Sequence, residues 1–255
     1  SIISLNIYWY IQTIKIDCRN NAWFVSQQQT PQMSQSVQTY LGPRGYTIMK
    51  SAISVEEQAL IRKELMAKPS IPSAPVQPPA YPIYRETPTR MYVPRQYGVD
   101  MYGDPEESRI PSGQDIAIDF AGGLRDYQTN IAETYLKHVT PNQYVGSGLL
   151  EIPCGRGKTV IGLNIISRLK KKTLIIVHKG FLLTQWIERI EEFLPGAKIG
   201  RIQGSTVDIE GKDIVIGMLQ SLSMKEYPAD TFASFGLVIV DECHHIGSEV
   251  FCRSL

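Results

Sequence analysis

Cysteine is scarce in this chain, with four residues in 255, and none of them stands in a CxxC pair. Disulfide frameworks and structural zinc sites depend on closely spaced cysteines, so free thiols in a reducing compartment are expected. His244 and His245 follow one of the cysteines, but adjacent side chains cannot by themselves surround a tetrahedral ion, and no zinc site is predicted. The four cysteines are Cys18, Cys154, Cys243 and Cys252.

Long apolar runs and an excess of charge are also missing. No apolar run reaches the roughly 18–20 residues that a membrane-spanning helix needs, so no membrane partner is predicted. Lys and Arg number 26 against 25 Asp and Glu, a formal net charge of +1. Any nucleic-acid site therefore has to be local.

Methionine is absent from residues 1–32, and Met33 is the first in the chain. Residues 1–24 are apolar and aromatic but have neither a basic start nor a small-residue cleavage site, which argues against a signal peptide. We assign residues 1–32 no function, and Met33 is a candidate for the true start.

Residues 33–120 are predicted to form a small α+β accessory module. The segment SVEEQALIRKELMA (54–67) has apolar positions at helical intervals. Six prolines within residues 69–82 predict an extended connector. Residues 83–120 are rich in Tyr, Pro and Gly, which indicates short strands and turns.

Residues 121–255 show a different pattern, in which apolar strands alternate with helices. Such alternation predicts an α/β domain with a parallel sheet covered on both faces. Strands are expected at 147–152, 173–178, 198–203, 213–218 and 237–242, and helices at 124–139, 157–169 and 181–194.

The segment EIPCGRGKT (151–159) lies between a predicted strand and a predicted helix and ends in Gly-Lys-Thr. Glycines let backbone N–H groups surround a phosphate, and the helix N-terminus adds positive potential. Lys158 is expected to reach the β- and γ-phosphates of ATP, and the Thr159 hydroxyl to bind Mg²⁺. Ile152 stands where the usual pattern has its first glycine, so a glycine-rich turn without a ligand is the alternative. The other loop residues expected at the nucleotide are Pro153, Cys154, Gly155, Arg156 and Gly157.

The apolar segment LVIV ends in two carboxylates, Asp241 and Glu242. Asp241 is expected to hold Mg²⁺, and Glu242 to polarise the water that attacks the γ-phosphate. A solvated turn is the alternative. The pair follows Lys158 by 83 positions (241 minus 158), a suitable distance for one ATP-binding domain. Lys158, Asp241 and Glu242 are therefore the predicted catalytic residues.

The run Asp241-Glu242-Cys243-His244 resembles the DExH motif of superfamily 2 helicases. The Pro-Cys-Gly-x-Gly-Lys form of the phosphate loop is similar to that of XPB-like helicases, and residues 172–204 and 213–222 resemble helicases of nucleocytoplasmic large DNA viruses. This resemblance implies a RecA-like first lobe that binds ATP and Mg²⁺ and moves on nucleic acid, DNA rather than RNA. It also implies an intracellular protein, in the cytoplasm or nucleus of an infected host or packaged in the virion.

The resemblance assigns further roles to residues that match the family motifs. Leu-Arg-Asp-Tyr-Gln (124–128) resembles the adenine-recognition motif, with Gln128 at the base edge and Arg125 in support; an ordinary helix start is the alternative. Trp186 is expected in the core rather than as a stacking platform. The resemblance places strand contacts at His178, Lys179, Gly180 and Gln185, and at Gln220 and Ser221.

The chain ends 14 residues after Asp241 (255 minus 241), before the coupling motif and the second lobe that the family carries. We therefore expect an incomplete first lobe, the N-terminal part of a longer helicase and inactive alone. Two alternatives remain: the motor subunit of a restriction or remodelling enzyme, and a fragment that binds ATP and nucleic acid without turnover.

Overall fold

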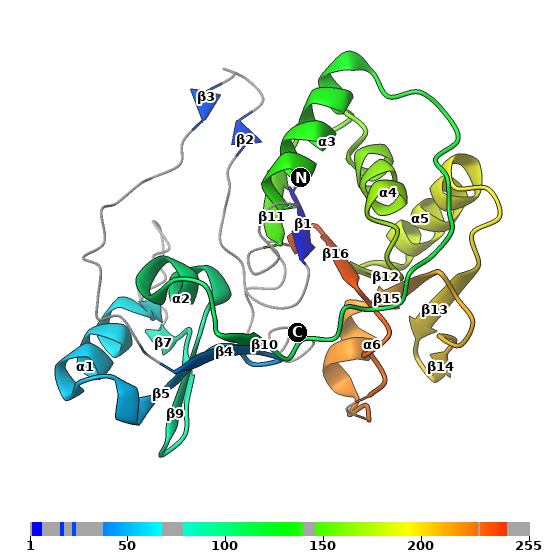
Figure 1. The fold of residues 1–255 in the computed structure, drawn as a ribbon. Coiled ribbons are helices and arrows are strands. Elements are labelled where there is room, and N and C mark those ends of the chain that lie inside the picture. The colour runs from blue at the N-terminus through cyan, green and yellow to red at the C-terminus, as the bar shows by residue number, and fades with distance from the viewer. Residues whose placement is uncertain are drawn as a thin grey trace. The chain divides into compact units, whose positions relative to one another are not determined.

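The computed structural model describes residues 2–6, 16–17, 22–23, 38–67, 79–139, 146–228 and 230–243 (Figure 1). Two compact units are present, one of residues 1–26 and 111–255 and the other of residues 27–110. Each unit is described by itself. Among the described residues, no helix has the length and apolar character to cross a membrane.

A seven-stranded sheet forms the centre of the first unit. Strands β16, β12, β15 and β13 pair in parallel, whereas β1 is antiparallel to both of its neighbours and β14 to β13. In sheet order the strands are β11 (Ser147–Glu151), β1 (Ile2–Asn6), β16 (Leu237–Asp241), β12 (Thr173–Val177), β15 (Ile214–Met218), β13 (Ile199–Gln203) and β14 (Thr206–Val207).

Helices cover both faces of this sheet. On one face, the core joins Ile175 and Ile239 of the sheet to α3 (Asp126–Val139), α4 (Lys158–Leu169) and α5 (Gly180–Phe193). On the other face, Ile176 and Val240 pack with α6 (Leu219–Met224). The predicted α/β domain with a RecA-like parallel sheet is confirmed. The β1 strand, which no sequence pattern predicted, lies between β11 and β16.

The second unit has an α+β arrangement. Its core includes Leu41, Tyr46 and Met91. The helix predicted within residues 54–67 is present as α1 (Val55–Glu64), and a capping box between Ser54 and Glu57 fixes its start. The five-stranded sheet contains, in order, β10 (Glu107–Ser108), β4 (Thr39–Gly42), β5 (Gly45–Met49), β9 (Arg90–Val93) and β8 (Arg85–Glu86), and the other elements are η1 (Lys50–Ala52) and α2 (Arg95–Tyr102).

Two short antiparallel pairs complete the described chain: β2 (Ile16–Asp17) with β3 (Ala22–Trp23), and β6 (Met66–Ala67) with β7 (Tyr81–Pro82). Most of the predicted proline-rich connector lies outside the described residues. Residues 111–120 belong to the first unit, in which Ile116 N donates a hydrogen bond to Lys170 O at 3.0 Å. Both the 120/121 boundary and the accessory role remain predictions.

Stability should depend on the central strand β16 far more than on the edge strand β14. Ile239 is fully buried, and Ile239→Ala should lower the free energy of unfolding by roughly 2–5 kcal/mol, because it removes apolar contacts and leaves a cavity. Val207 of β14 is 45% exposed, and Val207→Ala should change the same quantity by less than about 0.5 kcal/mol. Urea unfolding followed by circular dichroism measures both changes. Equal losses of unfolding free energy in the Ile239→Ala and Val207→Ala proteins would contradict the expected difference between the two strands.

Candidate nucleotide-binding site

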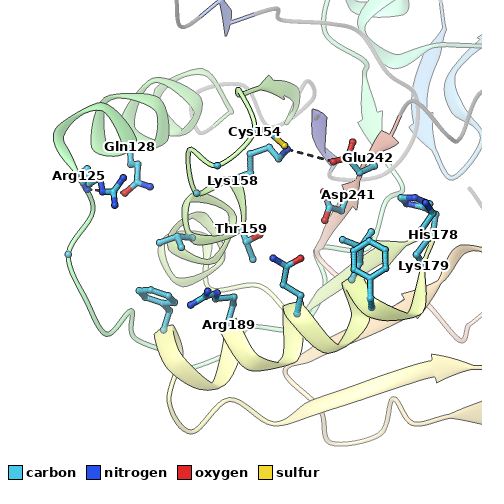
Figure 2. Close-up of a pocket in the computed structure, with 18 residues that line it drawn as sticks. Arg125, Gln128, Cys154, Lys158, Thr159, His178, Lys179, Arg189, Asp241 and Glu242 are labelled. Carbon is cyan, nitrogen blue, oxygen red and sulfur yellow. Dashed lines mark hydrogen bonds and ion pairs between the residues drawn. The ribbon is translucent and has the colours of Figure 1, made fainter.

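A cavity of about 800 Å³ opens where β11, β12 and β16 end (Figure 2). In parallel α/β sheets, ligands bind at the carboxyl ends of the strands. The walls of the cavity come from the phosphate loop, the acidic end of β16, the start of α3 and one side of α5. The residues that line it include Arg125, Gln128, Cys154, Gly155, Gly157, Lys158, Thr159, His178, Lys179, Gln185, Asp241 and Glu242.

The phosphate loop adopts the predicted strand–loop–helix form. Gly155 and Gly157 have φ values of 76° and 74°, in the left-handed region that glycine tolerates best. A Cβ atom at position 157 would also lie 2.4 Å from Nε2 of Gln128. Helix α4 begins at Lys158, so its unpaired N–H groups are available to an anion at the loop.

Ile152 occupies the position of the missing first glycine. Its side chain is 2% exposed and belongs to the core, and its φ is not positive. No glycine is required at this position, because the backbone conformation is ordinary and the side chain packs inward. The departure from the usual loop pattern therefore leaves the loop intact.

The two carboxylates at the end of β16 lie beside this loop. Lys158 Nζ is 3.6 Å from Glu242 Oε1, and Figure 2 shows the two groups facing one another with Asp241 alongside. Asp241 is 8% exposed, and Trp186 Nε1 donates a hydrogen bond to its Oδ2 at 2.9 Å. Burial raises the pKa of the Asp241 carboxyl, while the Trp186 hydrogen bond and the Lys158 charge partly oppose this rise.

The donor set fits a magnesium ion bound together with a nucleotide. The Thr159 hydroxyl and the Asp241 carboxylate line the same cavity, and both offer the hard oxygen ligands that Mg²⁺ prefers. Magnesium at phosphate sites is usually held by one or two carboxylates with phosphate oxygens and waters. Thr159 and Asp241 would therefore hold the ion, which would neutralise phosphate charge.

Arg125 and Gln128, the expected adenine-recognition residues, also line the cavity. Gln128 is 6% exposed; its Oε1 accepts a hydrogen bond from Arg125 N at 2.9 Å, and its Nε2 donates one to Arg156 O at 3.1 Å. Gln128 thus ties the start of α3 to the phosphate loop. The Gln128 amide has a second N–H and a second lone pair beyond these two bonds, so the bonds are compatible with contact to a base edge. This role stays a prediction.

The residues expected to contact nucleic acid fall into two groups. His178, Lys179 and Gln185 line the cavity, and Gly180 begins α5. Gln220 and Ser221 lie on α6 and are not among the described lining residues; the Ser221 hydroxyl accepts a hydrogen bond from Gly204 N at 2.9 Å. Both groups nevertheless follow strands that end at the same edge of the sheet, since Val177 and Met218, the last residues of β12 and β15, are paired. Their nucleic-acid role stays a prediction.

Helix α5 supplies cavity residues that the sequence analysis missed. Phe181, Arg189 and Phe193 line the cavity together with Gln185, at intervals of four residues. This spacing places them on one side of the helix, away from the buried Trp186 and Ile190. The four-residue interval was visible in the sequence, but nothing in it indicated a cavity on that side.

The cysteines and histidines near the site add no metal centre within the described residues. Cys154 is exposed and Cys243 is buried. Burial raises the pKa of the Cys243 thiol to about 11. Cys18, Cys252, His244 and His245 lie outside the described residues.

The family described as "Type III restriction enzyme, res subunit" matches residues 122–254, just over half of the chain. The chain belongs to this family. The match covers the phosphate loop, the α5 segment and the acidic pair, so it confirms that the chain is related to superfamily 2 helicases.

Relatives support the same family. The chain is 30% identical over 225 residues to a protein of Acanthamoeba polyphaga mimivirus with the provisional name ATP-dependent RNA helicase, covering 86% of this chain and 43% of that protein. It is 33% identical over 155 residues to a DNA 3'-5' translocase of the XPB kind from Sulfurisphaera tokodaii, covering 61% of this chain and 33% of that protein. It is 32% identical over 130 residues to a protein of African swine fever virus that also has the provisional name ATP-dependent RNA helicase. This match covers 49% of this chain and 25% of that protein. The resemblance to XPB-like and large-DNA-virus helicases is confirmed, and the chain spans less than half the length of each of these relatives.

Lys158→Ala should weaken Mg·ATP binding by roughly 1.5–3 kcal/mol, because it removes a charged hydrogen-bond donor from the phosphates. Lys137→Ala is the matched control, since Lys137 is exposed near the end of α3. Titration with a fluorescent ATP analogue measures both affinities. Equal binding by the Lys158→Ala protein and the parent would contradict the phosphate-loop assignment.

Proposed function

We propose that the chain binds Mg·ATP in this cavity and supplies the hydrolytic centre of a helicase or translocase that acts on nucleic acid. The observation that carries the proposal is the convergence of Lys158, Asp241 and Glu242 in one cavity at the end of a glycine-rich loop. The three residues come from segments 83 positions apart (241 minus 158), and the fold brings them together.

The ion pair between Lys158 and Glu242 suggests how ATP would engage the site. Phosphate oxygens would compete with Glu242 for the Lys158 ammonium group, which the loop holds at the start of α4. Once Lys158 binds phosphate, the Glu242 carboxylate is released to accept a proton from the attacking water. Backbone N–H groups of the loop would hold the phosphates in place during this step.

Nucleic acid would lie across the carboxyl ends of β12 and β15. His178, Lys179 and Gly180 follow the first of these strands, and Gln220 and Ser221 follow the second. Contacts of this kind grip phosphates and position the strand without reading its sequence. We favour DNA on the basis of the XPB-like resemblance, although the names of the two viral relatives refer to RNA.

The family description favours a second candidate, the motor subunit of a restriction enzyme. The ATP-binding lobe would act in the same way in both cases. Cleavage of double-stranded DNA by the native protein would support the restriction candidate, whereas strand displacement or translocation without cleavage would support the helicase.

In a protein that also carries the second lobe, Glu242→Gln should retain nucleotide binding and lose roughly 10²-fold or more of the ATP hydrolysis rate, because an amide cannot accept the proton of the attacking water. Glu226→Gln is the matched control, since Glu226 is exposed in the loop after α6. Phosphate release in the presence of nucleic acid measures the rate. A Glu242→Gln protein that hydrolyses ATP as fast as the parent would show that another group activates the water.

Lys179→Glu should weaken nucleic-acid binding to a similar extent for every sequence and should reduce the slope of log affinity against log salt by about one unit. Lys198→Glu is the control, because Lys198 is exposed just before β13, at the opposite edge of the sheet. Fluorescence anisotropy with DNA and RNA oligonucleotides of the same sequence measures the slopes and compares the two substrates. A change in sequence preference with an unchanged slope would be evidence against a phosphate contact.

A further inference from the structure

Trp186 makes a contact that its place in the core does not require. The side chain is 1% exposed and belongs to the apolar cluster between α5 and the sheet. Apolar packing does not require a hydrogen-bond donor here, and the indole N–H is the only polar group that tryptophan brings. That N–H donates to Asp241 Oδ2 at 2.9 Å, across 55 positions of sequence.

The acceptor of this bond is the carboxylate that would hold the metal ion. Asp241 is the last residue of β16 and is 8% exposed. A buried carboxylate is costly unless hydrogen bonds satisfy its oxygens. Because the indole N–H donates to Oδ2, the Asp241 carboxylate is restricted in its rotation. The buried Trp186 side chain thereby sets the orientation of the carboxylate.

The indole ring is itself held between the elements that carry the site. A Cβ atom built on Gly162 of α4 would lie 3.4 Å from Cη2 of Trp186 and 3.9 Å from Cδ1 of Ile239. Helix α4 starts at the phosphate loop, and β16 ends at Asp241. The ring therefore lies next to α4, and its N–H reaches Asp241 at the end of β16.

We propose that Trp186 is a positioning residue that holds the Asp241 carboxylate in the orientation from which it binds the divalent cation of the bound nucleotide. This proposal rests on the proposed function. A partner behind a metal ligand fixes the geometry of that ligand, and loss of such a partner typically weakens metal binding by roughly 10–100-fold.

The test measures metal binding directly, with Mn²⁺ as the probe. The parent and Trp186→Phe proteins are saturated with ADP, and free Mn²⁺ is followed by electron paramagnetic resonance. Trp186→Phe should bind Mn²⁺ roughly tenfold more weakly, because phenylalanine keeps an aromatic ring and lacks the donor. ADP affinity in the presence of EDTA should not change, since the phosphate loop is untouched. If the Phe protein does not fold, Trp186→Met removes the same donor while filling the space with a flexible chain.

A double-mutant cycle separates positioning from general destabilisation. In an Asp241→Asn protein, Trp186→Phe should cause no further loss of Mn²⁺ affinity, because both changes act through one ligand. Ile190→Ala is the control, since Ile190 is fully buried on the same helix and in the same cluster. It should lower stability and leave Mn²⁺ affinity unchanged.

Three results would overturn the proposal: parental Mn²⁺ affinity in Trp186→Phe, an equal loss in Ile190→Ala, or additive losses in the Asp241→Asn background. If Lys158→Ala abolishes ADP binding while Trp186→Phe behaves like the parent, the role of Trp186 is rejected and the proposed function stands. If the parent binds neither ADP nor Mn²⁺, both are rejected.

Discussion

Burial of the central strands on both faces is the constraint from which the rest of the structure follows. Every residue of β12 and β15 is buried, so these strands have no position for a charged side chain along their length. A charge within the sheet would cost several kcal/mol unless it were paired. Polar chemistry is therefore confined to the strand ends and the loops beyond them, where Lys158, His178 and Asp241 are found.

The same burial explains why much of the fold could be predicted from the sequence. A strand covered on both faces is apolar at every position, and an amphipathic helix repeats its apolar residues every three or four positions. Segments such as Thr173–Val177 and Gly180–Phe193 carry these patterns strongly, and both elements are where they were expected. The phosphate loop and the acidic pair were also predictable, because their chemistry requires particular residues in sequence order.

Contacts between distant residues could not be predicted in this way. Ile2–Asn6 is a five-residue segment with three apolar residues, and nothing in it specifies that it pairs with β11 and β16 in an antiparallel sense. Trp186 was correctly expected in the core, but its hydrogen bond to Asp241 depends on how α5 crosses the sheet. The role of the Phe181 side of α5 as a cavity wall likewise could not be predicted, because it depends on which elements lie opposite the helix.

The order of strands also sets the width of the site. Because β1 pairs with both β11 and β16, two strand spacings separate the strand that leads into the phosphate loop from the strand that ends in the acidic pair, a distance of roughly 10 Å. If those strands were neighbours, the carboxylates would be held against the loop and would repel any triphosphate. With one strand between them, the long side chain of Lys158 spans the distance and brings its Nζ to 3.6 Å from Glu242 Oε1. The sheet thus separates the carboxylates from the phosphates that the loop would bind, and the Lys158 ammonium group lies between them.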